Sequence, residues 1–168
     1  MKSKLSGPIL KITVDESDII ADAFAIFKDN KFEAFRPVRV NFIGQPAVDS
    51  GGPRREFFTR LFQEIVYSTQ GLAANLFEGE EGRLMPSYST ITVCSGVMKV
   101  IGKMIAYSIV RCGVGFPFLS PVCYCYLVTD DVNRAISYAN ITDVRDIGIC
   151  RPNQKGNARL EALIVSKK

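Results

Sequence analysis

The stretch from residue 48 to residue 58, Val-Asp-Ser-Gly-Gly-Pro-Arg-Arg-Glu-Phe-Phe, combines charged side chains with two adjacent glycines. Such glycines permit positive φ angles and close approach of another backbone. Arg55 and Glu56 follow them directly and are the polar residues best placed for a specific role. They could bind a ligand, or they could hydrogen-bond loop carbonyls and amides and hold a turn. The second role is favoured, because buried polar groups near a turn need partners. We therefore expect replacement of Gly52 by Val to lower thermal stability.

Common catalytic motifs are missing from the sequence. Pro53 and Arg54 follow the glycines where a phosphate-binding loop requires Lys and then Ser or Thr. The adjacent acids Glu80-Glu81 and Asp130-Asp131 are typical of solvated turns or helix starts rather than of acid–base pairs. Cys123 and Cys125 lack further ligands at metal-binding spacing, and the chain has no histidine. We expect no catalytic residue, no metal ligand and no cofactor.

Composition narrows the class of protein. With 168 residues, of which 47% are hydrophobic and 23% charged, one buried core is expected. The charges that give a net charge of +4 are dispersed, which argues against nucleic-acid binding. The longest apolar stretch, residues 97–110, contains two lysines and is too short to span a membrane. Five cysteines without a C-x-x-C pair predict buried, reduced thiols of a cytoplasmic or nuclear protein, which we expect to be a monomer.

The elements that position the glycine turn can be predicted from periodicity. Residues 9–14 and 38–42 alternate apolar and polar side chains, which predicts two strands. The acids at 15 and 16 predict the start of a helix of about four turns that ends near residue 30. Pro53 suits a first helical turn, and Arg54, Arg55, Arg60 and Glu64 are expected on the wet side of that helix. Its inward stripes comprise Phe57, Phe58, Leu61, Phe62 and Ile65.

Further along, a hairpin is predicted around residues 79–82. Residues 93–109 predict an apolar helix through the middle of the domain, with small residues such as Gly102 allowing a neighbour to approach closely. Ser120-Pro121 begins a short helix, and residues 132–149 predict one or two weaker ones. The fold class is α+β, predominantly helical with short strands, with a tail at 1–8, a domain at 9–150 and a loop and C-terminal segment at 151–168.

These residues together carry a family resemblance. The run Val40-Asn41-Phe42-Ile43-Gly44, then the glycine turn, then Arg55-Glu56-Phe57-Phe58 resembles the N-terminal lobe of the HECT-type ubiquitin-protein ligase domain. The order continues through Leu84-Met85-Pro86 and the helix that holds Gly102, so that the resemblance covers roughly residues 8–150. The family-signature residues in this chain are Asp49, Gly51, Gly52, Arg55, Glu56, Phe57, Phe58 and Gly102.

The resemblance implies a HECT N-lobe-like fold, restricted to the larger subdomain of that lobe. The family's catalytic cysteine lies in a separate C-terminal lobe near a His-Thr-Cys-type motif, which this chain lacks. A cysteine thioester then carries ubiquitin from a conjugating enzyme to a substrate lysine. The parent protein would therefore be a ubiquitin-protein transferase with the conjugating enzyme and ubiquitin as partners, and this chain alone would be inactive.

The chain also departs from the family pattern. Gln45-Pro46-Ala47 replaces an acidic residue and a glycine, Pro53 replaces a small aliphatic residue, and Ala106 stands at a usual glycine. These differences leave an alternative open, in which the chain is a non-catalytic interaction module that retains the fold. An enzyme of unrelated chemistry is disfavoured, because histidine, phosphate-binding and metal-binding motifs are missing.

Overall fold

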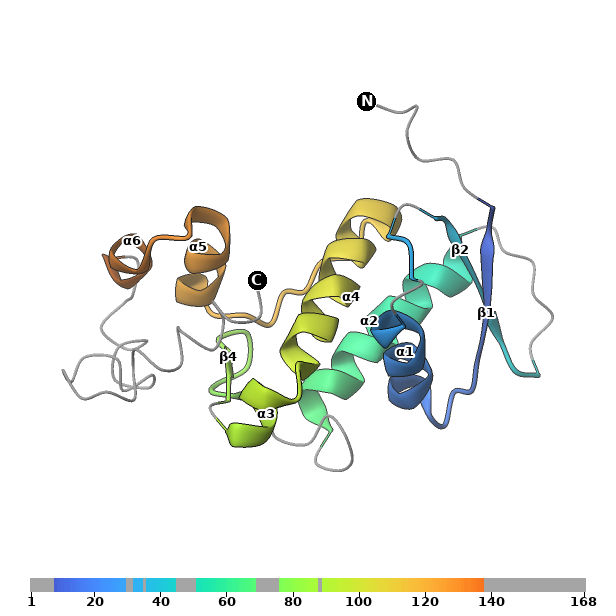
Figure 1. The fold of residues 1–168 in the computed structure, drawn as a ribbon, viewed down its shortest axis with the longest axis horizontal. Coiled ribbons are helices and arrows are strands. Elements are labelled where there is room, and N and C mark those ends of the chain that lie inside the picture. The colour runs from blue at the N-terminus through green and yellow to red at the C-terminus, as the bar shows by residue number, and fades with distance from the viewer. Residues whose placement is uncertain are drawn as a thin grey trace. The chain divides into compact units, whose positions relative to one another are not determined.

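The computed structural model describes residues 8–29, 32–34, 36–44, 51–68, 76–87 and 89–137. Helices dominate these residues and the strands are short, which confirms the predicted α+β fold class (Figure 1). The elements are β1 (Leu10–Val14), α1 (Ile19–Lys28), β2 (Val38–Phe42), α2 (Gly52–Tyr67), β3 (Phe77–Glu78), β4 (Met85–Pro86), α3 (Thr90–Cys94), α4 (Val97–Cys112), α5 (Pro121–Thr129) and α6 (Val132–Ser137).

Two compact units make up the described residues. One is drawn from Met1–Ala74 and Val100–Gly115, and the other from Asn75–Lys99 and Phe116–Lys168. The boundaries expected from the sequence, at residues 8 and 150, stay a prediction. The helix expected beyond Ser137 and the C-terminal segment 151–168 lie outside the described residues.

In the first unit, β1 and β2 form a parallel pair with Leu10 opposite Val38 and Val14 opposite Phe42. Both predicted strands are confirmed, and their inward residues, among them Val14 and Val40, are buried. A parallel pair needs a long crossover between its strands, and α1 lies in that crossover. α2 packs against α1 and β2, so the strand pair is covered by helices (Figure 1).

α1 is shorter than predicted, because the acids before it form a turn of their own. The Ser17 amide and hydroxyl both donate to Asp15 Oδ1, at 2.9 and 2.7 Å. These hydrogen bonds lower the pKa of the Asp15 carboxyl. The helix therefore starts at Ile19, with Asp18 as its N-cap residue, and ends at Lys28.

An aromatic cluster forms the core between the helices of this unit. The Phe58 ring lies 6.2 Å from Phe27 and 5.9 Å from Tyr107, measured between centroids. The Tyr107 hydroxyl donates to the Arg36 carbonyl at 2.8 Å, and burial raises the pKa of Tyr107. The predicted inward stripes of α2 are confirmed, since all five of their residues are buried: Phe57, Phe58, Leu61, Phe62 and Ile65.

The helix predicted over residues 93–109 is divided between α3 and α4, and α4 is buried on one face only, so the predicted burial of most of its circumference is wrong. Met104 is fully buried, but Ile109 is 53% and Val110 70% exposed. Gly102 is exposed as well, and a Cβ placed there would meet nothing within 4 Å, so no described neighbour approaches it closely. The prediction from apolar content therefore overestimated how much of this helix is buried.

The second unit contains the predicted hairpin, in which Glu78 of β3 pairs antiparallel with Met85 of β4. Ser120 caps α5 as predicted, accepting a hydrogen bond from the Cys123 amide at 3.2 Å. A small core then forms around two helices, from Met85, Val122, Cys123, Tyr126 and Ala135.

The cysteine prediction is confirmed only in part. Cys112 and Cys123 are buried thiols, and Cys125 is half-buried. Cys94 is exposed, contrary to prediction, and Cys150 lies outside the described residues. Within the described ranges, every helix is too short or too polar to cross a bilayer.

Candidate functional site

The glycine turn opens the helix α2, and its two glycines play different parts. Gly51 is the N-cap residue and has a φ of +95°, a left-handed conformation that side chains other than glycine rarely adopt. Gly52 is the first helical residue, and a Cβ there would meet nothing within 4 Å. The conformational requirement therefore lies at Gly51 rather than at Gly52, where we expected it. Asp49 lies outside the described residues.

The charged residues after the turn are arranged differently from the prediction. Glu56 forms an ion pair along the helix with Arg60, at 2.6 Å, rather than bonding to a loop. Arg55 is exposed, and its carbonyl accepts from the Thr59 hydroxyl. Arg54 was expected on the wet side but is partly buried, with a long contact of 3.5 Å from Nη1 to the Val38 carbonyl. Its Nε is buried without a partner among the described residues.

Arg60 connects three segments around the start of α2. Its guanidinium pairs with Glu16, at 3.0 Å, as well as with Glu56, and lies 5.7 Å from the centre of the Phe42 ring. The hydrogen bond to Glu16 is the main reason that the pKa of Arg60 is raised. Because these side chains are more than 40% exposed, the two ion pairs contribute little to the free energy of unfolding.

The two buried thiols are poor nucleophiles. Burial raises the pKa of Cys112, although the nearby charges of Arg54, Arg55 and Arg111 act in the opposite direction. Burial raises the pKa of Cys123 further, to about 12. Both thiols are therefore protonated at neutral pH and shielded from reaction partners. Since the thiolate is the reactive form of cysteine, they react slowly.

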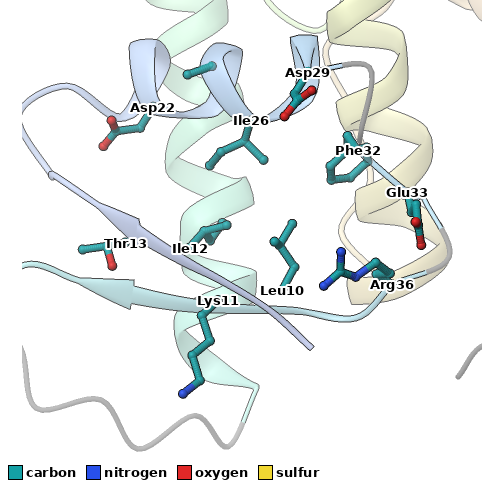
Figure 2. A pocket seen from close by; sticks show the side chains of 11 residues that line it. Leu10, Lys11, Ile12, Thr13, Asp22, Ile26, Asp29, Phe32, Glu33 and Arg36 are labelled. Atoms are coloured by element: carbon teal, nitrogen blue, oxygen red, sulfur yellow. The ribbon is translucent and has the colours of Figure 1, made fainter. Parts of the chain in front are cut away.

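A groove in the first unit was missed in the sequence. It has a volume of about 480 Å³ and lies between β1 and α1, where Figure 2 shows its lining side chains. α1 contributes Asp22, Ala25 and Ile26, and its C-cap residue Asp29 follows at the same spacing of i, i+3, i+4 and i+7 on a second face beside the buried stripe. That spacing was visible in the sequence, but its two acids made it resemble an ordinary solvated face.

The polar groups of the groove come from several segments. Asp22 accepts from the Asp15 amide at 2.9 Å, and the Arg36 guanidinium donates to the Pro8 carbonyl at 3.0 Å. Glu33 also lines the groove. Despite three carboxylates, no group of ligands in the described part of the chain is arranged to hold a metal ion.

Part of the chain is similar in sequence to known ubiquitin-protein ligases. Over 109 residues it is 28% identical to the human probable E3 ubiquitin-protein ligase HERC4, a match covering 64% of this chain and 10% of the human protein. The rat and mouse proteins of the same name are each 33% identical over 67 residues, which is 39% of this chain and 6% of each relative. The chain thus spans about a tenth or less of these curated relatives. No protein-family model matches it.

Proposed function

We propose that this chain is part of a HECT-type ubiquitin-protein ligase and supplies the larger subdomain of its N-terminal lobe. The local similarity to HERC4 proteins is the observation that carries the proposal. The signature residues add support, because Gly51, Arg55, Glu56, Phe57 and Phe58 fall in family order on one turn and one helix. In the full-length protein, the partners would be a ubiquitin-conjugating enzyme and ubiquitin.

Within that ligase, this part acts as a scaffold and not as the nucleophile. The start of α2 has a structural role: Gly51 makes the turn, Phe57 and Phe58 enter the core, and Glu56 pairs with Arg60. Cys112 and Cys123 are buried and protonated, so neither can readily accept ubiquitin by acyl transfer. Catalysis would then require the family's separate C-terminal lobe.

A non-catalytic interaction module is the second candidate. It is favoured by the departures at Gln45-Pro46-Ala47 and Pro53, and by the preformed groove between β1 and α1. The sequence that follows Lys168 in the parent gene product discriminates between the two. A further stretch of about 170 to 200 residues with a His-Thr-Cys-like motif would support the ligase, and a stop codon would support the module.

The scaffold role can be tested on the chain itself. We expect no ubiquitin thioester on any cysteine after incubation with activating enzyme, a panel of conjugating enzymes and ubiquitin, measured by intact-mass spectrometry with and without reductant. Exposed Cys94 is the internal control for accessibility, since it should react with a small alkylating reagent. A reducible ubiquitin adduct would contradict the scaffold role.

A further inference from the structure

One edge of β1 faces α1. The hydrogen bonds between β1 and β2 show which residues direct their backbone groups towards that edge. The Leu10 amide donates to the Pro37 carbonyl at 2.9 Å, and the Val14 carbonyl accepts from the Ile43 amide at 3.0 Å. Leu10, Ile12 and Val14 therefore direct their backbone groups towards β2. Because successive residues of a strand alternate between the two edges, Lys11 and Thr13 direct their amides and carbonyls to the opposite edge.

That opposite edge is the one that borders the groove. Asp15 follows Lys11 and Thr13 in the same alternation, and its amide donates to Asp22 Oδ2 on α1. Within the described ranges, β1 has only β2 as a neighbour in its sheet, and no residue there pairs with the backbone of Lys11 or Thr13 at the outer edge. Unpaired amides and carbonyls in a row are a template for a further strand.

The groove beside this edge has an apolar floor that is already fixed. Ala25, Ile26 and Phe32 line it. Phe32 is held in place by ring contacts with Phe27 and Tyr107, at centroid distances of 4.4 and 5.5 Å. An aliphatic side chain could therefore enter the groove without a prior rearrangement of the core.

Charge indicates what kind of segment would fit. Three lining carboxylates, those of Asp22, Asp29 and Glu33, outnumber the two lining cations, Lys11 and Arg36, and the Arg36 guanidinium already donates to the Pro8 carbonyl. The Lys11 side chain points away from the other labelled residues in Figure 2. The groove therefore favours a cationic occupant, since opposite charges across an interface select the partner.

We propose that an extended, basic segment of a partner protein adds to β1 as a third strand. Its backbone pairs with the amides and carbonyls of Lys11 and Thr13. Alternate side chains then fall on two faces, so that the lysine or arginine side chains on the groove face lay their aliphatic stems against Ile26 and Phe32 and bring their charges near Asp22 and Glu33. The proposal does not depend on the ligase assignment.

Defined peptides test the strand pairing directly on the 168-residue chain. Fluorescence anisotropy with an acetylated Lys-Val-Lys-Val-Lys-Val-Lys peptide should give saturable binding, and the matching Glu-Val peptide should bind at least about tenfold more weakly. Two further Lys-Val peptides carry N-methyl groups on the lysines or on the valines. Because only one set of amides faces β1, one of these peptides should lose binding and the other should keep it.

Protein variants locate the site. Thr13→Pro removes an edge-facing amide while leaving the bonds to β2 intact, so affinity for the Lys-Val peptide should fall about tenfold or more. Thr13→Ala is the matched control and should stay within about twofold. The double variant Asp22→Asn, Glu33→Gln should weaken binding and reduce its salt dependence. The N-methylated peptides keep the test valid even if Thr13→Pro disturbs the fold.

Three outcomes would overturn the proposal. One is the absence of saturable binding by the Lys-Val peptide, and another is equal binding of the two N-methylated peptides. The third is a dimer of the chain in sedimentation velocity that Thr13→Pro abolishes, because a second copy would then occupy the edge in place of a basic partner.

Discussion

At the start of α2, Gly51 and Gly52 make different demands on the backbone. A side chain at Gly51 would be forced into a left-handed conformation, whereas Gly52 has ordinary helical geometry and open space around it. We expect Gly51→Ala to lower the free energy of unfolding by about 1 kcal/mol, and Gly52→Ala to leave it unchanged or slightly raised. Urea unfolding of both variants tests this, and equal losses would contradict it.

The raised pKa of the buried Cys123 thiol should make the free energy of unfolding depend on pH. Its pKa rises from the ordinary value of 9.0 to about 12 on folding, so the folded protein retains a proton that the unfolded chain releases above pH 9. The stability from this buried neutral thiol is fully present below pH 9 and is lost as pH rises from 9 to 12. Between pH 8 and 10 the free energy of unfolding should fall by about 1 kcal/mol.

The Cys123→Ala variant is the control for that measurement. It lacks the titrating group, so its stability should fall by about 1 kcal/mol less than that of the parent chain over the same pH range. Chemical denaturation at pH 8 and at pH 10 gives both values. Parallel pH profiles for the two proteins would show that Cys123 does not titrate differently in the folded state.

At the scale of elements, local patterns predicted the strands but not their pairing. The alternation in residues 10–14 and 38–42 places Val14 and Val40 inward, and both are buried. The parallel register that brings Leu10 opposite Val38 joins residues far apart in the chain, and a period of two carries no such information. The groove was missed for the same reason, since its walls meet only after β1 and α1 have packed.

α4 shows where apolar content misleads. Val97 through Ile109 contains so many apolar residues that no single face stands out, and the sequence predicted burial on most of the circumference. In the structure, Tyr107 and Ser108 are buried while Ile109 is exposed. Packing against α1 and α2 selects the face, with Tyr107 anchored by the Arg36 carbonyl, and no helical period identifies that partner.

Substitutions on α4 test this one-sided arrangement. Met104→Ala should lower the free energy of unfolding by about 2 to 5 kcal/mol, because Met104 is fully buried. Ile109→Ala on the same helix should change it by less than about 0.5 kcal/mol. Gly102→Ala should raise it by roughly 0.5 to 1 kcal/mol, since the position is helical and open. Thermal unfolding separates these cases. Similar losses of stability for Met104→Ala and Ile109→Ala would indicate that both faces of α4 are buried.

At the scale of the whole molecule, the ordered signature was more informative than any single motif. Asp49 and Gly102 carry no recognisable chemistry alone, and Gly102 has no close neighbour in the described structure. The turn at Gly51, the stripe from Phe57 and the similarity to HERC4 proteins together support a ligase scaffold. The groove beside β1 is a surface feature that the family resemblance did not predict.

Ubiquitin thioester formation in the full-length parent protein tests the central claim most directly. With activating enzyme, conjugating enzymes and ubiquitin, we expect a reductant-sensitive adduct on a cysteine outside residues 1–168, located by mass spectrometry, and none within them. Replacing that outside cysteine by Ala should abolish the adduct, while replacing Cys94 should leave it unchanged. An adduct on a cysteine of residues 1–168, or none anywhere in the parent, would contradict the assignment of this chain as the scaffold of a HECT-type ligase.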